Sequence, residues 1–420
     1  MGEDKSNTES VAKMNPGTND LQNRRLQSLD AYRGLIMISL SFAGFGLAKT
    51  ATNFLKGNPD SGLWSAVRYQ FSHAPWAGCS YWDMIMPSFM FMVGVSMAYS
   101  YVNRKNRGDS YGRMLGHAIS RSIILIVLSI YLMSQWRSYT NWGFMNVLGQ
   151  IGLGYTFLFL LWGRSTKTHI ITAASLLVGT WLLYVSYPGS GIELATGNAE
   201  VGITKEWANE HMKGMRPSWH KNANVGHAVD VLFLNLFPLH EEYKFNGGGY
   251  QTINFIPALV TMLFGLMCGE LLRSQRSDRE KLKLLAIAGM SGLVVGQLLN
   301  LTGLCPLVKR IWTPSWALFS TGWCCLILCA LYWVVDVRGY RRWTYPLVVV
   351  GMNSIAVYCM SMSLKPYIAR QWQAHLGKDV FTFWEALRPG WAPCVQACLT
   401  GLTFWIVCWY MYRKKIFIRI

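Results

Sequence analysis

Long apolar runs separated by polar segments dominate the pattern of this chain. A helix needs roughly 20 mostly apolar residues to cross about 30 Å of hydrocarbon, and about ten runs reach or approach that length. The sequence therefore predicts an all-α fold, a polytopic membrane helix bundle of about ten transmembrane helices. We expect these helices near residues 30–50, 82–102, 115–134, 143–162, 168–187, 251–272, 283–301, 315–336, 344–364 and 391–412.

The polar segments predict the domain organisation. Residues 1–25 are rich in Asn, Ser and Gly and lack the apolar core of a cleavable signal peptide, so we expect a disordered cytoplasmic tail. Residues 26–420 are expected to form one transmembrane domain. Two of its outside connections are long, residues 51–81 and about 188–250, and long loops tend to be functional.

Composition and charge support a membrane location. The chain is 52% hydrophobic and only 14% charged, whereas soluble domains carry about 25% charged residues. Its net charge of +18 would suggest nucleic acid in a soluble protein, but the Lys and Arg residues gather in alternate connections. About 22 of them fall in about 66 positions on one side, against about 15 in roughly 140 on the other. The positive-inside rule then predicts that both termini are cytoplasmic, with the lipid bilayer and no nucleic acid as partner.

Cysteine and histidine usage gives little sign of a metal. Most of the 10 Cys lie inside apolar runs, where free Cys acts as a small hydrophobe. The 188–250 connection contains four histidines, but their spacing does not match HxxxH or HExxH. We expect this loop to be a solvated cap or a sugar-facing lid, without metal; the histidines are His211, His220, His227 and His240.

Ionisable residues in or beside the first two predicted helices are the strongest candidates for chemistry. Asp30 and Arg33 lie three residues apart, on one face of the first helix. They form either an ion pair that anchors the helix end or part of a site. Asp83 lies within the apolar run from Tyr81 to Met97. A carboxylate at membrane depth is costly and indicates a functional site.

His73 precedes Asp83 by ten residues. An imidazole with a pKa near 6.5 can take a proton from a nucleophile, while a carboxylate fixes its tautomer and stabilises its cation. The spacing does not establish contact, and a lone histidine in a loop is often an ordinary surface residue. From the residues alone, a general-base role for His73 stays open.

Several motifs recur along nearly the whole chain. Taken together, they resemble those of the transmembrane acyltransferase family that contains heparan-alpha-glucosaminide N-acetyltransferase and its bacterial relatives. The 188–250 loop resembles that family least. The motifs are Ser28-x-Asp30-x-x-Arg33-Gly34, His73-x-x-Trp76-x-Gly78, Asp83-x-x-x-Pro87-x-Phe89-x-Phe91-x-x-Gly94, Trp312-Thr313-Pro314-Ser315-Trp316, Asp336, Gly351-Met352-Asn353-Ser354-Ile355 and Tyr412 to Phe417.

The resemblance implies an acyltransferase domain over residues 26–420. It would take an acyl group, usually acetyl, from cytoplasmic acyl-CoA, with acetyl-CoA the usual donor, and pass it to a sugar or glycan on the other side. His73 matches the catalytic histidine, with Asp83 as its orienting partner. The remaining matched positions would bind substrate, support the core or contact the cofactor. For the core and substrate these are Asp30, Arg33, Trp76, Asn353 and Ser354, and for the cofactor Arg121 and Gln150.

The chain departs from the family pattern in two places. Gly44 stands where the lysosomal enzymes have Asn, and Gly149-Gln150 stands where they have Gln-Arg. We therefore expect a different acceptor. The resemblance also implies a bacterial inner (plasma) membrane protein. The acyl group, an acyl-histidine intermediate and the oligomeric state, including a homodimer, stay open.

Two other classes of function remain. A polytopic transporter or flippase for a small molecule or glycolipid would use intramembrane Asp and Arg residues for coupling. A structural or sensory membrane protein would not explain the clustered polar motifs. His73 favours the enzyme, because transport does not demand an imidazole at the mouth of a span.

Overall fold

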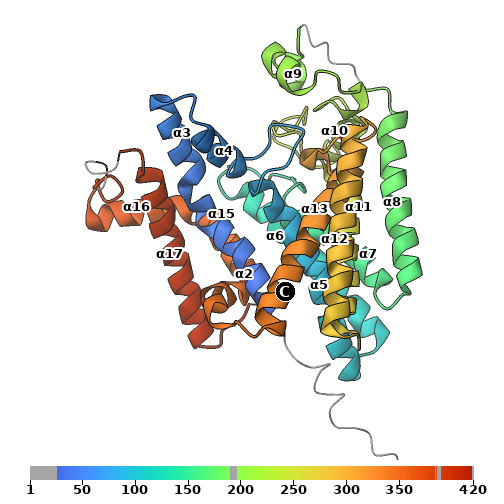
Figure 1. The fold of residues 1–420 in the computed structure, drawn as a ribbon. Helices are drawn as coiled ribbons and strands as arrows, with labels where there is room; N and C mark the ends of the chain where they lie inside the picture. Colours follow the sequence, from blue (N-terminus) through green and yellow to red (C-terminus); the bar gives the residue numbers. More distant parts are fainter. Residues whose placement is uncertain (1–25, 190–195, 384, 386–388, 419–420) are drawn as a thin grey trace, which may run out of the picture.

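The computed structural model describes residues 26–189, 196–383, 385 and 389–418, and the predicted tail at 1–25 lies outside them. Within those ranges the regular elements are helices (Figure 1). In chain order they are α2 (Gln27–Ser41), α3 (Leu47–Gly57), α4 (Gly62–Gln70), α5 (Ile85–Asn106), α6 (Tyr111–Ser134), α7 (Val147–Leu161), α8 (Thr166–Ser186), α9 (Lys205–His211), α10 (Val225–Leu234), α11 (Phe255–Arg273), α12 (Asp278–Leu301), α13 (Pro314–Leu331), α14 (Tyr345–Gly351), α15 (Ser354–Ser363), α16 (Lys365–Leu376) and α17 (Ala392–Arg413).

The lengths of these helices confirm a polytopic membrane bundle. Seven helical segments of the described chain are long and apolar enough to cross a bilayer, and two bent pairs bring the number to nine. The remaining predicted run, near 143–162, contains α7, which has only 15 residues, fewer than the roughly 20 that a span needs. The chain is therefore an integral membrane protein.

Bends in the first and ninth predicted spans were not expected from the sequence. The first span breaks between α2 and α3 by 44°, and the ninth breaks between α14 and α15 by 67°. Four successive residues with positive φ, from Ala43 to Gly46, produce the first bend. At the second, Asn353 has φ −125° and ψ 38°, outside the helical region.

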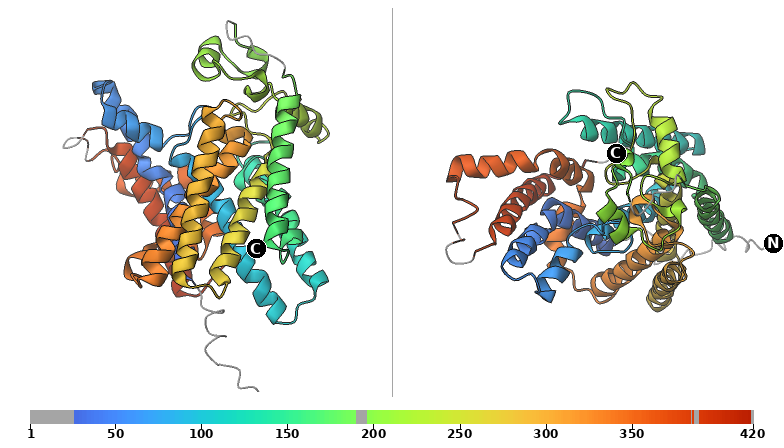
Figure 2. Two further views of the ribbon diagram at one scale, coloured as in Figure 1. Left: turned by 45° about the vertical axis from the view of Figure 1, so that its right-hand side comes forward. Right: turned by 90° about the horizontal axis from the view of Figure 1, so that it is seen from above.

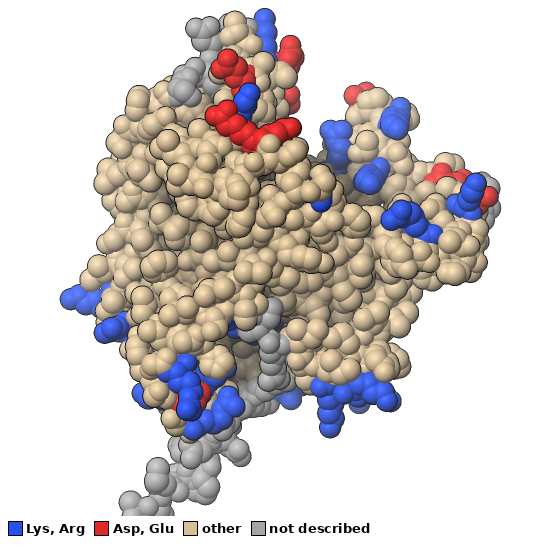
Figure 3. All heavy atoms as spheres, turned by 180° about the vertical axis from the view of Figure 1, so that it is seen from behind, with Lys and Arg blue, Asp and Glu red and all other residues tan. Residues whose placement is uncertain are grey.

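The two ends of the bundle differ in charge. We call the end that carries α9, α10 and residues 71–81 the loop end, and the opposite end, where α5 finishes in Arg104, Lys105 and Arg107, the basic end. In Figure 3 the lower rim, at the basic end, is mostly blue, the upper part mixes red and blue, and the wide belt between them is almost uncharged. Figure 2 shows that the helices run mainly between these ends.

The position of α5 is fixed by close backbone contact with α11. A Cβ atom on Gly94 would lie 1.8 Å from the carbonyl oxygen of Met262, and one on Gly265 would lie 2.0 Å from that of Phe91. Small residues allow two membrane helices to approach in this way. The contact holds α5 rigidly, and with it the segment just before α5 that carries Asp83.

The start of α2 is held by a carboxylate from a distant motif. The backbone N–H groups of Gln27 and Ser28 donate to the two oxygens of Asp336, over 3.2 and 3.1 Å. An acid at this position satisfies N–H groups that the first helical turn leaves unpaired and complements the helix dipole. Asp336 therefore has a structural role at the basic end.

Candidate active site

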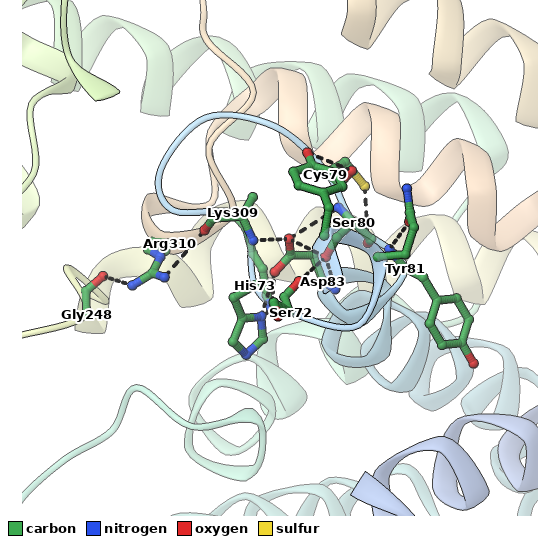
Figure 4. Close-up of polar contacts among 12 residues, drawn as sticks. Ser72, His73, Cys79, Ser80, Tyr81, Asp83, Gly248, Lys309 and Arg310 are labelled. Carbon is green, nitrogen blue, oxygen red and sulfur yellow. Dashed lines mark hydrogen bonds and ion pairs between the residues drawn. The ribbon is translucent and has the colours of Figure 1, made fainter. Parts of the chain in front are cut away.

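His73 and Asp83 are in contact at the loop end (Figure 4). His73 lies in the connection between α4 and α5, and Asp83 lies in the short 3-10 turn Trp82–Met84 that leads into α5. His73 Nδ1 is 2.7 Å from Asp83 Oδ1. The turn of residues 73–83 therefore brings together the two groups that sequence analysis singled out.

Polar groups surround the buried Asp83 carboxylate. One oxygen, Oδ2, accepts from the backbone N–H of Ala74 over 3.0 Å and of Ser80 over 3.3 Å, and the Ser80 hydroxyl lies 3.0 Å away. The other oxygen, Oδ1, accepts from Lys309 Nζ over 3.1 Å and faces His73. An ionised carboxylate is acceptor-only, which matches this set of donors.

The donors around Asp83 assign the tautomer of His73. Lys309 Nζ also lies 3.2 Å from His73 Nδ1. If the lysine donated to a lone pair on Nδ1, that nitrogen and Asp83 Oδ1 would be two acceptors 2.7 Å apart, which repel each other. The consistent assignment has Nδ1–H donating to Asp83 and Lys309 donating to the same oxygen. Nε2 then carries the lone pair.

The imidazole of His73 is half-exposed, with 40% of its side-chain surface accessible. Burial lowers its pKa from the usual 6.5, the hydrogen bond to Asp83 raises it, and the nearby positive charge of Lys309 lowers it again. The net pKa is below the ordinary value, so the ring is neutral at pH 7. A neutral, half-exposed imidazole with its lone pair on Nε2 can accept a proton, and Asp83 stabilises the cation that forms.

Lys309 and Arg310 were missed by sequence analysis. They lie in a short turn just before α13, and this segment is joined to residues 71–81 by the bond from Gly78 N to Leu307 O, 2.8 Å long. Arg310 donates to the carbonyl oxygens of Gly248, over 2.7 Å, and Ala74, over 3.4 Å. The available signal was a Lys-Arg pair on the side that should be poor in positive charge, directly before the motif at Trp312.

Trp76 ties the site to the long loop. Its indole N–H donates to the carbonyl oxygen of Trp219 over 3.1 Å, and its ring meets that of Trp207 edge to face, with centroids 6.1 Å apart. Trp76 is buried, and these contacts position the long loop, which we call the cap, over the site.

The loop histidines have separate partners. His220 Nε2 contacts the Met215 carbonyl oxygen, and His211 and His240 pack on the rings of Trp207 and Tyr139. In the part of the chain that the structure describes, no three His, Cys, Asp or Glu residues lie close enough together to hold a metal ion.

A cavity of about 650 Å³ lies at the basic end. It is bounded by α2, α5, α6, α7 and the break between α14 and α15, and five of its lining residues are Arg or His. The guanidinium of Arg121 lies over the ring of Tyr155, 4.6 Å from its centroid, and its buried Nε has no partner among the described residues. The five are Arg33, Arg104, Arg107, His117 and Arg121.

Some predicted residues line this cavity. Arg33 does so while pairing with Asp30 over 3.1 Å and bonding to Ser96. Ser354 also lines it, and its hydroxyl donates to the carbonyl oxygen of Gly351 over 2.7 Å. The Asp30–Arg33 pair therefore exists, and its arginine faces the cavity.

Asn353 and Gln150 are bonded to backbone. Asn353 donates to the carbonyl oxygen of Ile416 and accepts from the N–H of Ile418, which ties the α14–α15 break to the C-terminal segment. Gln150 does not line the cavity, and its amide donates to the carbonyl oxygens of Phe144 and Thr252, over 3.0 and 3.2 Å. Its expected contact with the cofactor stays a prediction, since the geometry gives it a structural role.

The arrangement places two different chemistries along one helix. Asp83 lies just before α5, and Phe89, six residues later and about 9 Å along the helix, lines the cavity. The basic cavity suits a polyanion, and the His73–Asp83 pair suits proton abstraction. A ligand that enters from the basic end with its charge held there would point its other end toward His73.

Comparison with known proteins finds two curated N-acetyltransferases that are similar to the chain. No family model matches it. It is 25% identical to human heparan-alpha-glucosaminide N-acetyltransferase over 94% of its own length, and 23% identical to the mouse enzyme over 96%. It spans 60% and 62% of the length of these two curated relatives. The alignment covers nearly the whole helix bundle, and the chain is a distant relative of the heparan-alpha-glucosaminide N-acetyltransferases.

Proposed function

We propose that this protein is a transmembrane acyltransferase. It moves an acyl group, most simply acetyl, from acyl-CoA bound at the basic end to a sugar or glycan acceptor at the loop end. The observation that carries this proposal is the His73–Asp83 pair at one end of α5 with a basic cavity along the rest of that helix. The similarity to two N-acetyltransferases supports it.

The cavity is the proposed donor site. Coenzyme A is a polyanion with a long, uncharged pantetheine arm. Its phosphates suit the arginines at the mouth, Arg104 and Arg107, and the arginines further in, Arg33 and Arg121. The arm would run along α5 toward Phe89 and carry the thioester to His73. The charge bias between the ends supports a cytoplasmic basic end with both termini inside. The bacterial plasma membrane is part of the proposal and rests on the resemblance of the motifs.

The reaction needs one base and one positioned carbonyl. His73 Nε2 removes the proton from the acceptor hydroxyl or amine. At the same time the acceptor's oxygen or nitrogen forms a bond to the thioester carbon. The carbon–sulfur bond breaks, and the coenzyme A thiolate takes the proton back from the imidazolium. Asp83 is a positioning residue that holds the tautomer and stabilises the cation. No metal is required for these steps.

The test is transfer of labelled acetyl from acetyl-CoA to a panel of soluble and cell-surface glycans by purified protein. His73→Ala should slow transfer at least about 100-fold, the low end of general-base contributions, and leave acetyl-CoA affinity unchanged because His73 lies away from the cavity. His375→Ala, at an exposed histidine of α16, is the matched control. Normal transfer by His73→Ala would show that another group is the base. Transport of a glycan without acetylation would refute the acyltransferase proposal and favour a transporter.

A further inference from the structure

A second cavity, of about 450 Å³, lies between α2, α5 and α13 in the half of the bundle nearer the loop end. We call it the lateral groove. Its lining is largely apolar, with Leu35 and Ile36 from α2, Ile85 from α5, and Phe319 and Ile327 from α13. The proposed mechanism does not use this space.

The lateral groove is separate from the proposed donor cavity. Tyr32 and Ser88 line the groove and bond to each other across the α2–α5 contact, over 3.2 Å. Their sequence neighbours Arg33 and Phe89 line the basic cavity on the other side of that contact. A ligand in the groove is therefore not the acyl-CoA donor.

The groove opens sideways, at the depth of the hydrocarbon. Trp323 lines it and is 42% exposed, although it lies nine residues inside the span that begins at Pro314, about 13 Å along the helix. The groove follows α13 from Phe319 to Ile327, a total extent of about 12 Å centred on Trp323. Its open side faces lipid, from which a hydrocarbon chain can enter without crossing water.

The upper end of the groove is polar and adjoins the active site. Ser39 and Tyr81 bond through their hydroxyls over 2.5 Å, and the side-chain oxygen of Gln70 accepts from the backbone N–H of Tyr81 over 2.9 Å. Ser80 lines the groove and also bonds to Asp83, which bonds to His73. Figure 4 shows Ser80 and Asp83 side by side, with Tyr81 on the opposite side from His73. One carboxylate thus links the groove wall to the base.

We propose that the lateral groove binds the hydrocarbon tail of a membrane glycolipid, whose sugar headgroup is the acyl acceptor. An apolar channel that opens to the bilayer and ends in hydroxyl and amide groups beside the base matches an amphiphile of this kind. The headgroup would pass over Ser80 and Tyr81 to reach His73. This inference rests on the proposed function for the reaction at the headgroup, and it adds the class of acceptor.

The first test compares two acceptors that share a headgroup. Protein in phosphatidylcholine nanodiscs is given labelled acetyl-CoA with methyl glucoside or dodecyl glucoside. Ile327→Trp fills the groove, while Ile287→Trp, on α12 at a position 51% exposed, adds the same bulk elsewhere. We expect Ile327→Trp to lower kcat/KM for the dodecyl acceptor at least about 10-fold and to leave the methyl acceptor unchanged. Equal kcat/KM for the two acceptors, unaffected by Ile327→Trp, would overturn the inference.

The second test does not depend on turnover. The wild-type protein is irradiated with dodecyl glucoside that carries a photoreactive diazirine near the end of its chain, and the labelled peptides are identified by mass spectrometry. We expect labelling of residues 319–327 that excess dodecyl glucoside prevents and dodecyl phosphocholine does not. Uniform labelling of lipid-facing helices, or equal competition by phosphocholine, would identify an ordinary bilayer contact and refute the inference. Groove labelling without acetyl transfer to any glycan would instead refute the proposed function.

Discussion

Removing both charges of the Asp83–Lys309 pair should abolish base function while sparing the fold. Lys309 has 6% of its side chain exposed and Asp83 has 2%, and the two are 3.1 Å apart. Asp83→Asn alone leaves a buried, unpaired ammonium, which costs about 3–5 kcal/mol out of a typical total of about 5–15 kcal/mol. Lys309→Met removes that charge at similar volume. The double variant should therefore regain stability, to within about 1 kcal/mol of the wild type.

The rate of the double variant follows from the hydrogen bonds at residue 83. In the wild type, the N–H groups of Ala74 and Ser80 point at one carboxylate oxygen and His73 Nδ1 contacts the other. An asparagine has one acceptor oxygen, which those N–H groups would occupy, so its NH₂ would face Nδ1. The imidazole would then accept at Nδ1 and carry its proton on Nε2, where the base needs a lone pair. We expect kcat to fall about 100- to 10,000-fold.

The assay measures acetyl transfer and the midpoint of thermal unfolding on the same preparations of the wild type, Asp83→Asn, Lys309→Met and the double variant. The expected pattern is low kcat both in Asp83→Asn and in the double variant. Of these two, only Asp83→Asn should have low stability, because it keeps Lys309. Recovery of near-normal kcat in the double variant would refute the tautomer argument. It would show that the single substitution acts through the stranded charge alone.

Three further predictions concern pH, donor binding and the cap. Because burial lowers the pKa of His73, its neutral form persists to lower pH. The value of kcat/KM should therefore stay constant on acidification and decline only below about pH 6.5. A decline that begins above pH 7 would exclude His73 as the base. Arg121→Gln should weaken acetyl-CoA binding about 10-fold or more, because a hydrogen bond to a charged group contributes about 1.5–3 kcal/mol; Arg113→Gln, at an arginine 69% exposed, should leave calorimetric affinity unchanged. Burial raises the pKa of Asp230 in α10 to about 7, so the folded state keeps this carboxyl protonated at a pH where the unfolded state ionises it. The resulting contribution to stability is fully present below about pH 3.9 and is lost as the pH rises through 7. Asp230→Asn should therefore make the unfolding midpoint less dependent on pH between 5 and 8, and an unchanged profile would assign that dependence to another group.

The fold was largely predictable because membrane helices are encoded locally. Each predicted apolar run contains helix, since a backbone in hydrocarbon must satisfy its own hydrogen bonds. The bends were not predictable. Ala43 and Phe45 adopt positive φ, a conformation that L-residues avoid, in a segment where the α17 backbone approaches so closely that a Cβ on Gly46 would lie 2.2 Å from the carbonyl oxygen of Pro393. Such tertiary contacts leave no periodic signal in the sequence.

The site was predictable only in part, for a related reason. His73 and Asp83 stood out because a carboxylate in an apolar run is costly and a histidine lies close to it in the chain. Lys309 is 226 residues from Asp83, and nothing near it in the sequence marks the pairing. The lateral groove arises from the packing of three helices, and its lining residues read individually as ordinary apolar positions.

The rigid contact between α5 and α11 fixes the distance between the two ends of α5. The helix has 22 residues, a length of about 33 Å, with arginines at one end and the Asp83 turn at the other. Because backbone meets backbone at Gly94 and Gly265, this distance cannot adjust to the donor. An acyl carrier held by its phosphates at the arginines must be long enough to reach along α5 to His73. Shortening the pantetheine arm would leave the thioester short of the imidazole, so the enzyme would select its donor by reach as well as by charge.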